Sequence, residues 1–267
     1  MFEGKGGINI DQYDCSRKIA TEIRDLGVFP GDTVLVHSSL KSLGNVPGGI
    51  ETVIQGFLLA IGPDGTLLMP ALSGALQSPG FFDVKLVPTN IGAVPEYFRT
   101  RDGTYRSLNP SHSACAVGRR SHELLDDHRL DCTPCGQHSP FRKVAETKTG
   151  KIVMLGCGLD TNTTMHALDA YYNDPAYLCA PVLFTLKDWQ GNIHQKEYKL
   201  HGPGSCVQRY DRVLDLDSGS FLRRGKVLQA ATFVLSAPGL KNAVLKKLKE
   251  NPDFFVDQKK LHFLTRS

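Results

Sequence analysis

A histidine and an aspartate three residues apart, His166 and Asp169, form a pair that could perform acid–base chemistry. They follow a glycine-rich turn in the stretch LGCGLDTNTTMHALD, and on a helix residues three apart share one face. A carboxylate beside an imidazole fixes one tautomer of the ring and raises its basicity, as general-base catalysis requires. The alternative interpretation is a surface ion pair that takes part in no reaction.

A second polar group, His37, Ser38 and Ser39, stands where the apolar run TVLV ends. The loop that follows, KSLGNVPGG, is rich in glycine, so its backbone N–H groups can approach a ligand. The start of the next helix favours an anion, and Lys41 adds a point charge for a phosphate. No Gly-Lys-Ser/Thr follows the glycines, so this is not a P-loop. An ordinary strand-to-helix turn with a capping hydroxyl is the alternative.

Two weaker patterns suggest other chemistry. Four side chains of HRLDCTPCGQH have spacings that a small zinc site could use: His128, Cys132, Cys135 and His138. Only one close cysteine pair is present, so we interpret residues 127–142 as a plain loop and expect no metal. The glycines before His166 resemble a methyltransferase motif, but they lie past the middle of the chain and a hairpin follows, which does not fit that class.

Both polar groups follow predicted strands, and these strands are expected to form a parallel sheet. Apolar runs predict strands over 33–37, 66–70 and 151–156, and helical periodicity predicts a helix over 49–61 between the first two strands. Such a βαβ unit binds ligands at the carboxyl ends of its strands. A helix over 163–172 would carry the histidine–aspartate pair to the same edge.

The rest of the chain completes one α/β domain. The remaining predicted elements are helices over 16–26, 91–99, 120–126 and 240–250, strands over 113–117 and 261–265, and a hairpin within 182–200. Residues 71–90 lack periodicity and are expected to form an exposed loop. We therefore expect a three-layer α/β fold with a mainly parallel central sheet, antiparallel additions in the C-terminal part, and a single domain over 1–267.

The composition excludes several classes of protein. With 267 residues, 41% hydrophobic and 22% charged, the chain is typical of a globular domain. A net charge of +4 without a dense basic stripe argues against a nucleic-acid partner. Residues 1–14 show no signal-peptide pattern and no apolar stretch reaches the length of a membrane span. Seven cysteines, an odd number, then predict reduced thiols in the cytoplasm.

Over roughly residues 16 to 250, the chain resembles the aminoglycoside 3-N-acetyltransferase family, also called the antibiotic N-acetyltransferases. The resemblance rests on the order and spacing of GDTVLVHSSLKSLGNVPGG, GTLLMP, RSLNPSHSACAVG, GQHSPF and MLGCGLDTNTTMHALD. It implies an acyltransferase that uses acetyl-CoA as co-substrate to acetylate an amino group of a small molecule such as an aminoglycoside. It also implies an expected homodimer, as a property of the class.

The resemblance also assigns roles to residues. His166 matches the histidine of an NTxxHxxE-like segment, the family's general base, and Asp169 stands where the family usually has glutamate. The residues that would line the path of the coenzyme are His37, Ser38, Ser39, Leu40, Lys41, Leu43, Gly44 and Val46, completed by Ser113, Ala114 and Phe141. The resemblance leaves open which acid supports His166, because an aspartate has a shorter arm than a glutamate.

The segment 71–90 departs from the family. Aminoglycoside-modifying members tend to carry a longer, acid-rich insertion there, whereas this chain has Asp83 as its sole carboxylate. Because aminoglycosides are polycations, a nearly neutral loop favours a smaller or less charged acceptor. The expected mechanism is direct transfer with His166 as the base. A covalent route through Cys157 and a coenzyme-binding protein without activity are the alternatives, and the acceptor, its regiochemistry and the oligomeric state stay open.

Overall fold

The computed structural model describes residues 10–73, 80–172, 178–201, 206–217 and 219–258. The strand expected over 261–265 lies outside these residues. The helices are α1 (Ile10–Asp25), α2 (Gly49–Ile61), α3 (Ala93–Thr100), α4 (Ser121–Leu125), α5 (Pro140–Glu146), α6 (Thr164–Asp169) and α7 (Ala237–Glu250), with short 3-10 helices η1 (Leu40–Leu43), η2 (Asp126–Leu130), η3 (Leu159–Thr161) and η4 (Tyr210–Leu216). The strands are β1 (Thr33–Ser38), β2 (Thr66–Pro70), β3 (Gly80–Asp83), β4 (Tyr105–Arg106), β5 (Ala114–Gly118), β6 (Gly150–Leu155), β7 (Val182–Lys187), β8 (Ile193–Tyr198), β9 (Cys206–Gln208), β10 (Leu222–Val227), β11 (Ala230–Ser236) and β12 (Val256–Gln258).

A seven-stranded sheet in the order β10-β11-β6-β1-β2-β5-β4 forms the centre of the fold. Its middle strands β6, β1 and β2 run parallel, as the βαβ pattern predicts. The strands outside them, β11 beside β6 and β5 beside β2, are antiparallel. The α/β class with a parallel centre is confirmed, and the antiparallel strands come from the middle of the chain as well as from its C-terminal part.

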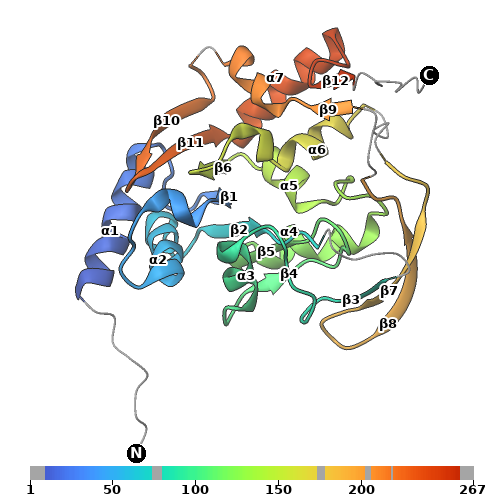
Figure 1. Cartoon of the computed structure of the whole chain (residues 1–267), viewed down its shortest axis with the longest axis horizontal. Helices are drawn as coiled ribbons and strands as arrows, with labels where there is room; N and C mark the ends of the chain where they lie inside the picture. Colours follow the sequence, from blue (N-terminus) through green and yellow to red (C-terminus); the bar gives the residue numbers. More distant parts are fainter. Residues whose placement is uncertain (1–9, 74–79, 173–177, 202–205, 218, 259–267) are drawn as a thin grey trace, which may run out of the picture.

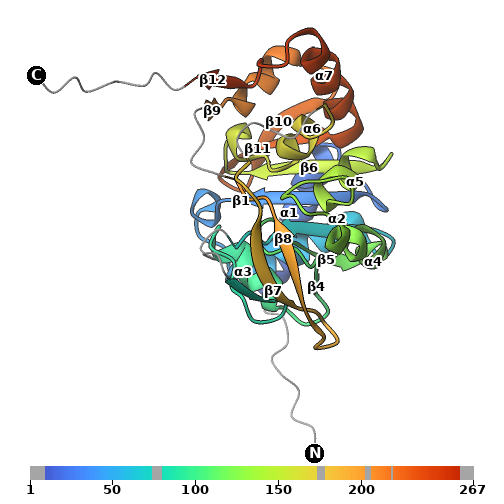
Figure 2. The ribbon, with the colours of Figure 1, turned by 90° about the vertical axis from the view of Figure 1, so that its right-hand side faces the viewer.

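Successive side chains of β1 point to opposite faces of the sheet, so its apolar residues are divided between two hydrophobic cores. Val34 and Val36 pack with α1 and α2 on one face, and Leu35 packs with α5, α6 and α7 on the other. Successive strand residues point to opposite faces, so a strand covered on both sides is apolar throughout. Figures 1 and 2 show these helices on the two sides of the sheet. The expected three layers are therefore present.

The pair α1 and α2 packs tightly because a glycine lies at their contact. A Cβ atom on Gly56 would come within 2.5 Å of the Ile19 side chain. Helix α2 has the bounds that the sequence predicts, whereas α1 begins at Ile10, six residues before its predicted start. The added turns carry few buried residues, and such turns leave little signal in an apolar pattern.

The prediction for residues 71–90 as loop is wrong at β3, which pairs in parallel with β7. Together β3, β7 and β8 form a separate three-stranded sheet, and its hairpin β7–β8 curves along the lower right of Figure 1. The hairpin β10–β11 was not predicted from the sequence. Its outer strand LRRGKV is exposed at four of six positions, as an edge strand protected by charge should be.

In the described part of the chain, no helix combines the length and the apolar character needed to cross a bilayer.

Candidate active site

The parallel strands end together at one edge of the sheet, where a cavity of about 330 Å³ opens. Residues from the ends of β1, β2 and β6, from the start of α3 and from the segment before α6 line it: His37, Ser38, Pro70, Leu72, Ile91, Pro95, Cys157, Thr161 and Thr163. The loop after β1 is attached to the end of β6, because the Ser42 hydroxyl donates to the Gly156 carbonyl at 2.9 Å. The cavity therefore lies where parallel α/β sheets bind ligands.

Several buried polar atoms around this cavity have no hydrogen-bond partner among the described residues. His37 Nε2 and Ser38 Oγ belong to residues that line the cavity, and Asn162 Nδ2 and Thr164 Oγ1 belong to residues adjacent in sequence to Thr161 and Thr163, which line it. A buried polar group without a partner costs about 1–3 kcal/mol, so such a cluster is expected where a ligand supplies the missing bonds. Hydroxyl, amide and imidazole groups suit the amide-bearing pantetheine arm and the thioester carbonyl of acetyl-CoA.

The other predicted coenzyme residues occupy different environments. Ser39, Leu40 and Val46 are partly buried, and Lys41 and Gly44 are exposed on the loop that borders the cavity. The side chains of Leu43, Ala114 and Phe141 are buried in the two cores. The Ser113 hydroxyl is occupied by Arg106 and by the Ala71 carbonyl. The side chains of these last four residues are therefore not available to a ligand, which could contact only their backbone.

His166 is held by a phenol that joins it to Asp169. The hydroxyl of Tyr210 lies 2.9 Å from His166 Nδ1 and 2.8 Å from Asp169 Oδ2. Because a phenol has one proton and the carboxylate can only accept, the hydroxyl donates to Asp169 and accepts from Nδ1–H. The lone pair of His166 is then on Nε2. The side-chain nitrogen of Gln208 lies 3.3 Å from the same Nδ1, but both nitrogens carry protons in this tautomer, so they do not hydrogen-bond to each other.

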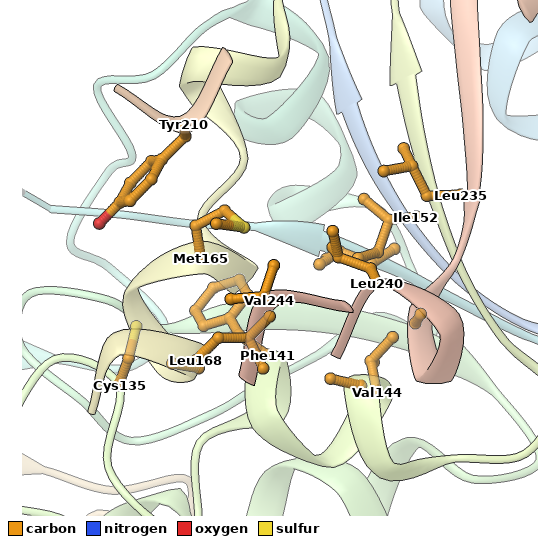
Figure 3. Close-up of a cluster of buried hydrophobic side chains, with 14 of the residues drawn as sticks. Cys135, Phe141, Val144, Ile152, Met165, Leu168, Tyr210, Leu235, Leu240 and Val244 are labelled. Carbon is orange, nitrogen blue, oxygen red and sulfur yellow. The ribbon is translucent and has the colours of Figure 1, made fainter. Parts of the chain in front are cut away.

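Core packing of α6 gives His166 its orientation. Met165 and Leu168 are fully buried, so the residues that follow each of them, His166 and Asp169, face away from the core together. Figure 3 shows Met165 and Leu168 inside the apolar cluster, with the Tyr210 ring at its edge. Burial, with a smaller contribution from His201, lowers the pKa of His166 well below its usual value. The ring is therefore neutral at pH 7.

Sequence reasoning did not identify four residues beside His166. Tyr210 and Gln208 come from a segment more than forty residues away, and no pattern in that segment indicates chemistry. The rings of His201 and His112 lie 4.4 and 5.8 Å from the His166 ring. His112 belongs to the stretch NPSHSA, so this part of the family-like pattern could have indicated it.

The pattern HRLDCTPCGQH does not assemble a metal site. Within the described part of the chain, a single group of potential ligands lies close enough to hold an ion, and it contains none of these four residues. His128 is instead fully buried, with Nδ1 2.9 Å from the Ser107 hydroxyl. Cys132 is exposed and Cys135 is buried, and six cysteines of the chain, these two included, are free thiols.

Lowering the pH is expected to reduce the free energy of unfolding, because His37 is buried in its neutral form. Burial lowers the pKa of His37 to about 4 from its usual 6.5. A histidine with a depressed native pKa contributes its full stability above pH 6.5, and that stability is lost as the pH falls toward 4. Between pH 7 and 5 the His37→Gln variant should lose about 2 kcal/mol less free energy of unfolding than the parent. Urea unfolding at both pH values measures this, with the exposed His122→Gln as control, and equal losses in parent and His37→Gln would contradict it.

Gly156 is expected to tolerate alanine less well than a glycine in open space does. Its φ is +70°, and an added Cβ would come within 2.4 Å of the Ser42 Cβ. Gly191, with φ +89°, has open space around the same position. Both alanine variants carry backbone strain, but only Gly156→Ala adds a clash, so it should lose about 1 kcal/mol more stability. Thermal unfolding of the two variants checks this difference, and equal shifts in Tm would exclude the clash.

Comparison with solved structures identifies the fold. The structure of aminoglycoside acetyltransferase AAC(3)-IVa, as a histidine-to-alanine variant in complex with a gentamicin, superposes with a TM-score of 0.78 and 28% identity, over 90% of each chain. The fold is thus that of the aminoglycoside acetyltransferases. The sequence model described as aminoglycoside 3-N-acetyltransferase matches residues 35–249.

A relative from Pseudomonas aeruginosa, aminoglycoside N(3)-acetyltransferase III, is 35% identical over 240 residues, which cover 80% of this chain and 86% of the relative. The chain therefore belongs to the aminoglycoside 3-N-acetyltransferase family. Aminoglycoside N(3)-acetyltransferase VIII from Streptomyces fradiae is 34% identical over 179 residues. That match covers 59% of this chain and 61% of the length of the relative.

Proposed function

We propose that this protein transfers the acetyl group of acetyl-CoA to an amino group of an aminoglycoside or another antibiotic-like small molecule. The family supports the reaction, and one observation supports the mechanism: His166 is linked through the Tyr210 hydroxyl to Asp169, on a helix whose preceding residues line the cavity. The thioester end of the coenzyme would occupy the cavity, with its carbonyl near Ser38.

His166 acts as the general base in this proposal. The attacking nitrogen becomes strongly acidic as it bonds to the thioester carbon, so even a weakly basic imidazole can accept its proton. Nε2 accepts this proton, and Nδ1–H then shares the positive charge with Tyr210 and Asp169. Asp169 therefore supports the base although its arm is shorter than that of glutamate, because the phenol spans the distance between the two side chains.

Hydroxyl groups near the strand end are suited to stabilise the tetrahedral oxyanion. The candidates are Ser38, Ser39 and Thr164. Ser38 Oγ and Thr164 Oγ1 are buried and have no partner among the described residues, so they can donate without breaking another bond. When the intermediate collapses, the carbon–sulfur bond breaks and the sulfur takes the proton from His166 Nε2, so that coenzyme A leaves as the thiol and the imidazole is neutral again.

Direct transfer is favoured over a route through an acetylated cysteine. Cys157 lines the cavity and is the only thiol there among the described residues. Burial raises the pKa of Cys157 above its usual value, and the nearby Asp160 acts in the same direction. The thiolate is the nucleophilic form, so a raised pKa makes this residue less nucleophilic at neutral pH than an ordinary cysteine.

The acceptor is proposed to carry less positive charge than a typical aminoglycoside. Asp83, the sole carboxylate of the segment 71–90, is 3% exposed and pairs with Lys187 at 3.1 Å. It also accepts hydrogen bonds from the backbone of Lys85 and Leu86. Its charge is therefore already neutralised within the protein, and it offers little to a cationic ligand.

A thiol-release assay tests the reaction and the choice of acceptor together. Acetyl-CoA is supplied with aminoglycosides, amino-nucleosides or amino-phosphonates, and free coenzyme A is measured as it forms. We expect turnover with at least one amine and the highest kcat/KM with an acceptor of low charge. Coenzyme binding by calorimetry without turnover on any amine would instead support the alternative of a binding protein without activity.

A further inference from the structure

Three imidazole rings from distant segments of the chain converge at helix α6. His166 lies on α6, His112 lies just before β5, and His201 forms an isolated bridge with Leu178. One ring nitrogen from each lies within 4.8 Å of those of the other two. Within the described residues this is the only such group of histidine, cysteine and acidic side chains.

The spacing of the rings is close to that of a three-histidine metal centre. With zinc–nitrogen bonds of 2.0–2.1 Å, tetrahedral geometry puts the ligand nitrogens about 3.3 Å apart and the ring centres about 5.2 Å apart. The three centroid separations here are 4.4, 4.6 and 5.8 Å. Each nitrogen would have to move inward by at most about 0.8 Å to bind one ion. Small side-chain rotations supply such a movement.

Outer hydrogen bonds hold two of the rings by their Nδ1 atoms. Tyr210 binds Nδ1 of His166, and the Ser111 hydroxyl lies 3.1 Å from Nδ1 of His112. Histidines that bind metals usually have such a partner on the second nitrogen, often leading to a carboxylate, as Tyr210 leads to Asp169. This arrangement makes Nε2 the ligand atom in both rings.

We propose that His112, His166 and His201 bind one zinc-class divalent ion. Imidazole nitrogens without an oxygen ligand from the protein favour zinc, copper or nickel over magnesium or calcium.

This ion and the proposed catalytic base exclude each other. A lone pair that His166 donates to a metal cannot accept a proton from an amine. On the basis of the proposed function, zinc should therefore inhibit acetyl transfer, and a chelator should restore it. The site would make the enzyme sensitive to free zinc through the residue that performs the chemistry.

Calorimetric titration of zinc into the untagged, chelator-treated full chain tests the site. We expect one ion per chain and an affinity at least about 100-fold lower in His112→Gln and in His201→Gln, because loss of even an outer partner costs 10–100-fold. The exposed His194→Gln should bind zinc like the parent. Circular dichroism establishes that the variants are folded, and cobalt in place of zinc should give a tetrahedral spectrum without thiolate bands.

The possible results separate this proposal from the proposed function. Absence of binding, binding unchanged in both histidine variants, or a thiolate spectrum from exposed Cys132 or Cys179 would overturn the metal site and leave the base assignment intact. Binding that inhibits transfer, with recovery after chelation, supports both proposals. Binding combined with activity that requires the ion supports the site and overturns His166 as the base.

Discussion

Replacing His166 by alanine is expected to lower kcat by about 10²–10⁴-fold, the usual cost of losing a general base. The affinity for coenzyme A should be largely retained, because the residues that line the cavity, such as His37 and Ser38, are unchanged. The remaining turnover would come from binding and from the oxyanion donors. Steady-state kinetics of thiol release and calorimetry with coenzyme A measure the two effects separately.

A matched control for His166→Ala is His194→Ala, which removes an exposed imidazole from strand β8. It should keep the kcat and the Tm of the parent. A wild-type kcat in His166→Ala would rule out the base assignment. A drop in coenzyme affinity equal to the drop in kcat would mean that His166 binds the coenzyme, and the base would then have to be another residue.

Tyr210→Phe is expected to reduce kcat by about 10²-fold. The variant keeps the ring, which is 1% exposed and packs beside Phe255, but removes the hydroxyl that joins His166 to Asp169. Loss of a hydrogen bond that involves a charged group costs about 1.5–3 kcal/mol, and each 1.4 kcal/mol is a tenfold change in rate. Tyr210 does not contact the reacting atoms in this proposal, so it is a positioning residue.

The pH profile distinguishes this role from a purely structural one. Without the phenol, Asp169 no longer stabilises the protonated ring, so the acid limb of kcat should move to lower pH while the maximum rate falls. Tyr172→Phe, which removes an exposed hydroxyl bonded to the Leu245 carbonyl, should change neither. An unshifted acid limb in Tyr210→Phe would refute the relay.

A double-mutant cycle tests whether Asp169 acts through Tyr210. If it does, Asp169→Asn should reduce kcat about as much as Tyr210→Phe, and the double variant should be little worse than either. Effects that multiply would show that the two residues act on the reaction independently. The cycle therefore tests whether Asp169 is the acid that supports His166, although its side chain is shorter than that of the glutamate usual in the family.

The elements that form the edge of the site could be predicted because their signals are local. Strands β1 and β2 and the helix α2 between them have the predicted positions, with differences of at most one residue. Apolar runs separated by glycine and proline turns are sufficient for this. The carboxyl ends of parallel strands meet at one edge, so the proximity of Ser38 and Thr163 follows from the same pattern.

Elements without a local signal were not predicted. The strand β3 is four residues long and is stabilised by pairing with β7, a hundred residues later. The edge strand β10 carries three basic residues and a glycine, a composition that favours a loop, and it forms because β11 provides a ladder of partners. In both cases the stabilising interactions come from tertiary contacts that no window of sequence contains.

By itself, the sequence determined the α/β class, the edge of the sheet that carries the polar strand ends, and the shared helical face of His166 and Asp169. Only the tertiary structure decided what surrounds the imidazole: the phenol of Tyr210 on one nitrogen and the rings of His112 and His201 nearby. Periodicity records which face of an element is buried. Contacts between side chains more than thirty residues apart depend on how the elements pack in space.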